Sequence, residues 1–428
     1  MSPATARKER SRAERPNASA PDARPRASVA LRDSSPAAYH LVWVTTLILL
    51  VAGMCMMLSV SVAEGLSGGD KYGYLSTQGI AAAVGLVFLG ILWSLDYRKL
   101  RAISVAFLIA VGFLLLLVHI PGFGHSVGGA QSYLSIGPFT LQPSEFAKLA
   151  LVLLGAHLLS GRRARAGDFQ AFMWPFGVVG VVLCGMVTLE GDLGTAIIMA
   201  GLLMGMLWLG GMKAGHWLAL TGTGVAAAMA LVLTNGERMS RVFSFLDPSS
   251  DPQGSAYQLG QSLVALGRGG WIGVGPGESV QKFQYLPKAH TDMIFSILGE
   301  EFGLLGAGSV LVLFGVFAFA CWQLARRCSD PMGKYLIAGC GMLVTLQAVV
   351  NIGGVIGALP LTGVPLPFIS YGRSSLVAML MAVGVILAVA RRAPARQAPS
   401  PAVRYENVTR IDRRRRDGGA CGARPSPR

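Results

Sequence analysis

One carboxylate stands where a polar loop turns into a strongly apolar run. The segment Tyr285–Phe295 ends the loop and places Asp292 directly before that run. An acid at the mouth of a membrane-spanning segment costs free energy unless it is paired, hydrated or used, so it marks a candidate functional site. A carboxylate at the edge of a bilayer is suited to act as a general base. The structural alternative is a helix cap, in which Thr291 or Asp292 accepts hydrogen bonds from the first free N–H groups of a helix.

The elements that must position this acid are membrane-spanning helices. Of the 428 residues, 52% are hydrophobic and only 14% are charged, whereas charged residues make up roughly 25% of soluble domains. Apolar runs recur along the chain, and about 20 apolar residues suffice for one span. We predict an all-α fold, a polytopic membrane helix bundle of about ten transmembrane spans. The spans are expected near residues 40–62, 78–95, 101–119, 142–160, 172–188, 191–210, 214–234, 293–325, 334–357 and 367–391.

Charge separates this bundle from two tails. Residues 1–38 hold eight Arg or Lys against four acids, and residues 391–428 hold eleven against three, so the tails contribute +4 and +8 of the net +15. Both are rich in Pro, Ala, Ser and Arg and have little to bury. We expect disordered basic tails at 1–38 and 392–428 around a transmembrane domain at 39–391. Arg413–Arg416 could bind anionic lipid or nucleic acid, but no RNA-binding motif accompanies it and we expect no nucleic-acid partner.

Loop charge predicts the orientation of the bundle, because short cytoplasmic loops carry an excess of Lys and Arg. The loops after the second, fourth, sixth and eighth spans are basic, whereas the short loops on the other side hold only Lys71. Both termini are therefore expected in the cytoplasm, with the long loop 235–292 on the outer side. The cytoplasmic loops contain no phosphate-binding glycine pattern, which excludes an ATPase. The polar segments then gather on the outer face, in Gln142–Lys148, Glu190–Asp192, 235–292 and 359–375.

Several charged residues lie inside the predicted spans. Glu145 and Lys148 are three residues apart and share a helix face, so they either neutralise each other or join Asp192 in a polar network that supports a cavity. Glu300 follows Asp292 by eight residues, which would place it on the same face about 12 Å further along a helix. We expect it to pair with a cation or to line a hydrated cavity.

Four outer-face segments follow one another in a characteristic order. They are Gly129–Tyr133 followed by Gln142–Lys148, then Asp192–Thr195, then Gly273–Lys282 followed by Leu286–Pro287 and His290–Asp292, and finally Leu366–Ser375. Together they resemble the SEDS family of cell-wall proteins, FtsW, RodA and SpoVE, over about residues 40–391. Two pieces, Ser279–Lys282 and Tyr285–Pro287, are closer to the FtsW/SpoVE branch than to RodA.

The resemblance implies an enzyme, a lipid II-dependent peptidoglycan glycosyltransferase of the bacterial cytoplasmic membrane. It would polymerise lipid II, an undecaprenyl-pyrophosphate disaccharide-peptide, into glycan strands on the outer face of that membrane. The implied partners are a class B penicillin-binding protein and other divisome proteins, in cell division or sporulation. The essential Asp of the family maps onto Asp292.

In that reaction a sugar hydroxyl loses a proton to Asp292 as it attacks an anomeric carbon. Pyrophosphate leaves, so positive charge or a divalent cation, Mg²⁺ or Mn²⁺ held by Asp292, is expected to stabilise it. The candidate cations are Lys282, Lys288 and Arg268, although each is also explained as a solvated loop charge. The other candidate substrate-binding residues are His290, Ser279, Tyr133, Gln142, Ser370 and Arg373.

The chain departs from the family pattern at two of these positions, and two other functions fit the sequence. Tyr133 stands where many relatives have Trp, and Arg373 where they have Gly. These departures fit a non-catalytic scaffold for a penicillin-binding protein, for which Asp292→Ala would leave function intact. A lipid II flippase is the other alternative, and it requires polar residues in both halves of the membrane. The glycines of 267–277 either let a ligand approach the backbone closely or make the loop flexible.

Overall fold

The computed structural model describes most of the chain. The described residues are 36–66, 72–120, 122–127, 130–136, 139–161, 173–234, 236, 239–240, 245, 254–283 and 285–393. The predicted tails at 1–38 and 392–428 lie almost entirely outside the described residues, as does much of the first half of the loop 235–292.

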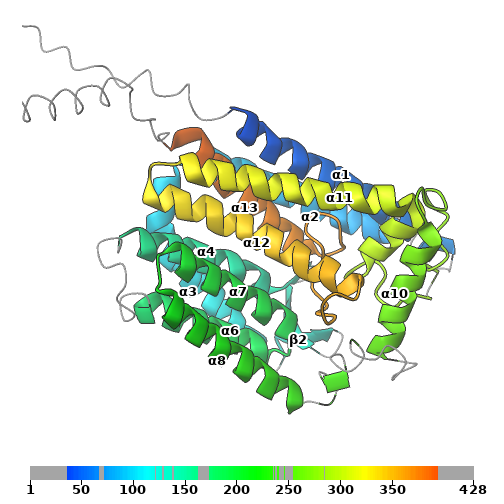
Figure 1. The fold of residues 1–428 in the computed structure, drawn as a ribbon, viewed down its shortest axis with the longest axis horizontal. Coiled ribbons are helices and arrows are strands. Elements are labelled where there is room, and N and C mark those ends of the chain that lie inside the picture. The colour runs from blue at the N-terminus through cyan, green and yellow to red at the C-terminus, as the bar shows by residue number, and fades with distance from the viewer. Residues whose placement is uncertain are drawn as a thin grey trace, which may run out of the picture.

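Each predicted span corresponds to a helix, which confirms the all-α membrane bundle. The ten helices are α1 (Pro36–Leu66), α2 (Gly73–Ser94), α3 (Leu100–Val118), α4 (Pro143–Ser160), α6 (Val178–Leu189), α7 (Leu193–Leu209), α8 (Ala214–Leu233), α11 (Ile294–Arg327), α12 (Pro331–Val355) and α13 (Arg373–Arg392). Figure 1 shows them running side by side along the long axis of the molecule.

Within the described ranges, seven of these helices are long and apolar enough to cross a membrane: α1, α2, α3, α8, α11, α12 and α13. Helices α6 and α7 are apolar but shorter. Helix α4 carries Glu145 and Lys148 in its first two turns. It therefore depends on its neighbours to bury its charges.

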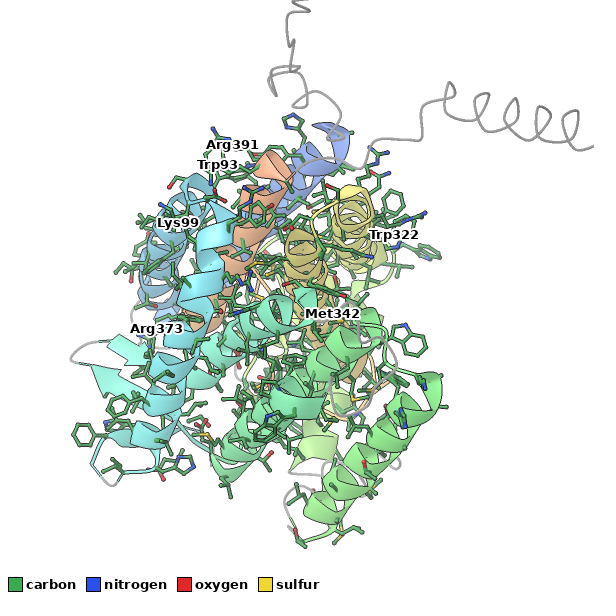
Figure 2. The ribbon with its side chains drawn as sticks, turned by 90° about the vertical axis from the view of Figure 1, so that its left-hand side faces the viewer. Trp93, Lys99, Trp322, Met342, Arg373 and Arg391 are labelled. Atoms are coloured by element: carbon green, nitrogen blue, oxygen red, sulfur yellow. The ribbon has the colours of Figure 1, made fainter. Side chains whose placement is uncertain are left out.

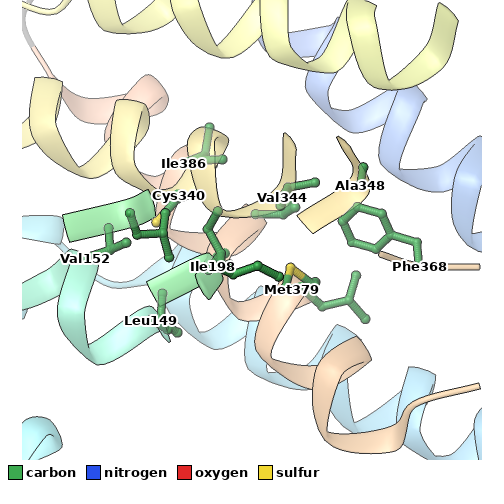
Figure 3. Close-up of a cluster of buried hydrophobic side chains, with 14 of the residues drawn as sticks. Leu149, Val152, Ile198, Cys340, Val344, Ala348, Phe368, Met379 and Ile386 are labelled. Atoms are coloured by element: carbon green, nitrogen blue, oxygen red, sulfur yellow. The ribbon is translucent and has the colours of Figure 1, made fainter. Parts of the chain in front are cut away.

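Helix α4 is the centre of the bundle. Fourteen of its 18 residues are buried, as expected for a helix that is surrounded by other helices. Leu149 and Val152 of α4 pack with Ile198 of α7, Cys340 of α12 and Ile386 of α13 in the core shown in Figure 3. Helix α8 has no buried residue and lies at the periphery.

The sequence did not predict two elements, both at one end of the bundle (Figure 1). The first is a three-stranded antiparallel sheet of β1 (Gly124–Val127), β2 (Ala130–Ile136) and β3 (Phe139–Leu141). The second is helix α10 (Ser255–Gly269), inside the segment predicted as a loop. Its buried residues recur every three or four positions and face α11; they are Ala256, Leu259, Ser262, Ala265 and Gly269.

The two ends of the bundle differ in charge. At the end opposite the sheet, basic residues lie between α2 and α3 and in the last turns of α11 and α13: Arg98, Lys99, Arg326, Arg327, Arg391 and Arg392. There the guanidinium of Arg391 lies 5.4 Å from the ring of Trp93, and the two are neighbours in Figure 2. We call this the basic end, and the end with the sheet, α10 and Asp292 the site end.

Candidate functional site

Asp292 lies just outside the first turn of α11 and does not cap it. The N-cap residue is Met293, and no side-chain cap hydrogen bond forms there. The Thr291 hydroxyl donates to Oδ1 of Asp292 at 2.7 Å. The helix-cap alternative is therefore wrong, and the position of Asp292 needs another explanation.

One side chain of α12 ties the backbone of Asp292 to that of Val364. The side-chain amide nitrogen of Asn351, in α12, donates to the backbone carbonyl of Asp292 at 2.8 Å and to that of Val364 at 2.7 Å. A Cβ atom added to Gly363 would lie 3.7 Å from Oδ2 of Asp292. Asp292 is only 6% exposed, yet Oδ2 accepts no hydrogen bond from the described residues. This oxygen is therefore free to take a proton or a ligand.

A second group of polar residues lies at the start of α4 and in the α6–α7 turn, where Glu145, Lys148 and Asp192 were predicted to share a network and Gln142 to bind substrate. Oδ1 of Asp192 accepts from the N–H of Thr195 at 2.9 Å, capping α7, and Oδ2 accepts from the side-chain amide of Gln142 at 3.1 Å. The backbone N–H of Gln142 in turn donates to the Ser374 hydroxyl of α13 at 2.9 Å. The start of α4 and the start of α13 are thereby joined to the end of the α6–α7 turn.

The buried pair of α4 makes a second set of hydrogen bonds, which reaches α12 and the start of α13. Lys148 donates to Glu145 at 2.8 Å and to Oε1 of Gln347 at 2.5 Å. Gln347 donates onward to the Pro365 carbonyl and the Ser375 hydroxyl. The pair therefore neutralises itself and also fastens α12 and the start of α13. Among the described residues no hydrogen bond joins either side chain directly to Asp192, so the network with Asp192 stays a prediction.

The charges of several predicted residues act on the phenol of Tyr133. Burial, followed by the negative charges of Glu145, Asp192 and Asp292, raises the pKa of Tyr133 to about 12, and the charge of Arg373 opposes them. These charges act on one phenol although they come from four distant parts of the chain. At neutral pH the phenol keeps its proton and can donate a hydrogen bond.

Glu190 contributes an unusual carboxyl to the same region. Its side chain is buried, and among the described residues neither of its carboxylate oxygens has a hydrogen-bond partner. Burial, and next the charge of Asp192, raise the pKa of Glu190 to about 9. The group is therefore protonated at pH 7. Burial also raises the pKa of Asp192, against the hydrogen bond from Thr195.

The predicted residues of the 366–375 segment occupy different environments. Arg373 reaches the sheet, where it donates to the Thr140 hydroxyl at 2.5 Å. The hydroxyl of Ser370 is buried and accepts from the N–H of Leu366 at 2.8 Å, so it closes a turn. His290 stacks on Tyr74 of α2, with ring centroids 4.4 Å apart.

Three other predicted residues, Lys282, Ser279 and Arg268, lie apart from this group and contact two acids of α11. Lys282 lies 3.1 Å from Glu301, with both side chains almost fully buried. The Ser279 hydroxyl donates to Glu300 at 2.5 Å, and Arg268, whose side chain is half exposed, lies 3.7 Å from Glu300. In the described part of the chain, Glu300 shares no hydrogen bond or ion pair with the network around Asp192.

Two sequence-based expectations change in consequence. Asp292 precedes α11, so the helical spacing that was expected to place Glu300 below it does not apply. Lys288 is exposed and has a left-handed backbone with φ of 55°. Of the three predicted cations, Lys282, Lys288 and Arg268, only Lys288 makes no ion pair with a described residue.

The glycine-rich loop of residues 267–277 packs against the backbone of α11. Helix α11 is broken at Gly303, where φ is 67° and ψ is −165°. The N–H groups of Val274 and Gly275 donate to the carbonyls of Glu300 and Glu301, and Leu304 donates back to Gly270. A Cβ on Gly303 would lie 2.5 Å from the backbone N of Gly273, so side chains are excluded where these two backbones meet.

Sequence reasoning missed Asn351 and Gln347, which hold the two halves of the site. Both are buried amides in the otherwise apolar span of α12. A polar side chain inside such a span is itself a signal, because it must find a partner there. A metal site is less evident: within the described ranges, no group of three His, Cys, Asp or Glu residues could hold an ion.

The chain is similar to known proteins. The chain matches the family model described as cell cycle protein, named for FtsW, RodA and SpoVE, over residues 39–394. It is 38% identical to Stage V sporulation protein E of Bacillus subtilis, with 82% of this chain and 96% of that protein covered. It is 40% identical to the probable peptidoglycan glycosyltransferase FtsW of Nitrosococcus halophilus, with 77% and 86% covered.

Solved structures agree with the sequence matches. One, described as "Structural coordination of polymerization and crosslinking by a peptidoglycan synthase complex", gives a TM-score of 0.67 at 27% identity and covers 82% of this chain and 96% of that one. Rod shape determining protein RodA of Thermus thermophilus gives 0.60 at 25% identity, with 82% and 95% covered. The chain therefore belongs to the FtsW/RodA/SpoVE family of cell cycle proteins.

Proposed function

We propose that this chain is a peptidoglycan glycosyltransferase that polymerises lipid II, with Asp292 as the general base. The observation that carries the proposal is the carboxylate itself: it is enclosed, its backbone is held by Asn351, and Oδ2 accepts no hydrogen bond from the described residues. Identities of 38% to a sporulation protein and 40% to FtsW support a role in division or sporulation.

The reaction joins two lipid-linked sugars. The hydroxyl of the acceptor sugar attacks the anomeric carbon of the donor and transfers its proton to Oδ2 of Asp292. The new glycosidic C–O bond forms as the bond from that carbon to the phosphate oxygen breaks, and undecaprenyl pyrophosphate leaves as an anion.

Several residues are placed to assist this reaction. Arg373 and Lys288 can stabilise the leaving pyrophosphate, and the Tyr133 phenol can donate a hydrogen bond to the substrate. Lys282 and Arg268 are less suited, because Glu301 and Glu300 already engage them. Asp292 has one oxygen free for a divalent cation such as Mg²⁺ or Mn²⁺, which would add charge stabilisation when bound together with the pyrophosphate.

The charge at the two ends supports the orientation. The basic residues between α2 and α3 and at the ends of α11 and α13 support a cytoplasmic basic end, and with it both termini in the cytoplasm and Asp292 on the outer side of the cytoplasmic membrane. The similarity to a complex for polymerization and crosslinking supports a cross-linking partner, a class B penicillin-binding protein, in company with other divisome proteins.

The core argues against transport of the lipid headgroup. A flippase needs polar residues through the whole membrane. Towards the basic end the centre of the bundle is apolar, with Val152, Cys340 and Ile386 packed together (Figure 3).

The test compares wild type with Asp292→Asn, using purified protein, its penicillin-binding partner and lipid II. The asparagine keeps the shape and can still accept from Thr291, so the fold should persist. Glycan chains read on a gel should decrease by about 10²- to 10⁴-fold. Asp96→Asn, at the basic end, is the matched control and should retain full synthesis. Equal chains from wild type and Asp292→Asn would refute the catalytic role, and a wild type that binds its partner but makes no chains would support the scaffold.

A further inference from the structure

Gln78 is a buried amide in α2 whose side chain forms hydrogen bonds with the backbone of the Ser370–Gly372 turn. It is 1% exposed although α2 is otherwise an apolar span. Its nitrogen donates to the Ser370 carbonyl at 3.0 Å, and its oxygen accepts from the N–H of Gly372 at 3.4 Å. One side chain thus holds the backbone on both sides of Tyr371.

Tyr371 in turn holds the segment that ends in Asp292. Its N–H donates to the His290 carbonyl at 2.9 Å. Its hydroxyl lies 3.1 Å from the Thr77 hydroxyl, and its ring meets that of Tyr74 edge-on, with centroids 5.0 Å apart. Because Tyr74 also stacks on His290, the first turns of α2 contact both segments of the site.

Helix α2 is a rigid base for these contacts, because it packs closely along α13. A Cβ on Gly384 of α13 would lie 2.9 Å from the Leu89 carbonyl of α2, so the two backbones nearly touch. Small residues allow such close approach between membrane helices. The position of Gln78 is therefore fixed relative to the start of α13, where Arg373 stands.

Two segments that are far apart in sequence are held in register by this arrangement. Asp292 lies two residues beyond His290, and Arg373 directly follows Gly372. A shift of the Ser370–Gly372 turn would move Arg373, because Arg373 is the next residue in the chain. It would also move His290, because the Tyr371 N–H is bonded to the His290 carbonyl. The separation between the proposed base and the cation for the leaving group thus depends on the amide of Gln78.

We infer that Gln78 is a positioning residue for the proposed transferase reaction, on which this inference rests. It touches no substrate and acts through Tyr371 to set the placement of Asp292 against Arg373. Only a group with a donor and an acceptor side by side fits between the Ser370 carbonyl and the Gly372 N–H. Misplacement of reacting groups by about 1 Å can lower a rate by about 10²-fold.

The first test is Gln78→Leu, assayed with partner and lipid II. We expect kcat to fall by about 10- to 100-fold, while KM changes by less than about 3-fold, because the interaction lost is one that orients the reacting groups rather than one that binds substrate. Gln323→Leu, an equivalent substitution in α11 at the basic end, should leave both constants unchanged.

The second test is Gln78→Glu, which makes the donor dependent on pH. In its protonated form the new carboxylic acid can donate to the Ser370 carbonyl and accept from Gly372, as the amide does. Once ionised it can only accept. The activity ratio of Gln78→Glu to wild type should therefore fall as pH rises. The neighbouring groups Asp292, His290 and Tyr371 are present in both proteins, so a pH dependence that the two proteins share cancels in that ratio.

The outcomes separate the two proposals. If Gln78→Leu folds and has the kcat of wild type, or if the Gln78→Glu ratio is constant between pH 5 and 9 in protein that still binds its partner, the positioning role is refuted. If Gln78→Leu fails to fold, the pH series on Gln78→Glu decides alone. If wild type itself makes no glycan, the proposed function is at fault and not the role of Gln78.

Discussion

Replacing Lys282 by Met should destabilise the protein strongly while leaving its chemistry intact. Nζ of Lys282 lies 3.1 Å from Glu301 and 3.0 Å from the Ser59 hydroxyl. The lysine and glutamate side chains are 3% and 1% exposed. At an effective dielectric constant of about 20, the attraction at that separation is about 5 kcal/mol, and the cost of burying both charges offsets much of it.

Removing one partner leaves the other charge buried and unpaired. From the described residues, the Glu301 carboxylate would then retain only the hydrogen bond from Ser59, at 2.6 Å. Loss of one member of a buried pair typically costs about 3–5 kcal/mol, whereas neutral replacement of both is often nearly neutral. We therefore expect Lys282→Met to lose about that much free energy of unfolding, and Lys282→Met combined with Glu301→Gln to recover most of it.

The assay is SDS-titrated unfolding in detergent micelles for wild type, both single variants and the double variant, read as a double-mutant cycle. Glycan synthesis is measured at a temperature where all four are folded. A Lys282→Met protein as stable as wild type would refute the reasoning. A stable double variant whose KM for lipid II remains raised would show that Lys282 also binds substrate, as the sequence predicted.

Two further changes test other parts of the structure. Gly303→Ala should destabilise the protein by about 1–3 kcal/mol, because the residue has φ of 67° and the added Cβ meets the N of Gly273 at 2.5 Å. Gly308→Ala, in the same helix with open space around it, is the control. Equal melting temperatures for the two variants would contradict the close backbone contact between Gly303 and Gly273. Glu190→Gln should remove a pH dependence of the free energy of unfolding. In the folded protein the pKa of this carboxyl is raised from 4.5 to about 9, so between these pH values the folded state holds a proton that the unfolded state has lost. The stabilisation is therefore full below about pH 4.5 and decreases as pH rises towards 9. Thermal unfolding at pH 6 and 9 should show the variant gaining on wild type at pH 9, and an unchanged wild-type slope in the variant would contradict the assignment.

The sequence predicted the helices well, because an apolar run of sufficient length is a local property. It failed for the sheet and for α10. Strands of four, seven and three residues are too short to stand out beside the spans. Helix α10 has only a narrow apolar stripe between glycines, and that stripe becomes interpretable only when α11 is seen beside it.

The site was predicted in part. Asp292, Asp192 and Gln142 were identified because polar groups at the edge of apolar runs need a reason to be there. Lys282 and Ser279 looked equally exposed in sequence, yet both are engaged by acids of α11. Asn351 and Gln78, which position the acid and its surroundings in the structure, were overlooked because single amides hardly change the hydropathy of a span.

The amino-acid sequence by itself determined which segments enter the membrane, which carboxylate stands at the end of a span, and the family to which the motifs belong. Only the tertiary structure decided which distant partners complete the buried polar contacts, such as Gln347 on Lys148 and Ser59 on Glu301, which lie 199 and 242 residues apart along the chain and are brought together by packing. The physical reason is that hydrophobicity acts on each segment independently, whereas a buried lysine or amide is satisfied by whichever partner the packed bundle places within hydrogen-bonding distance.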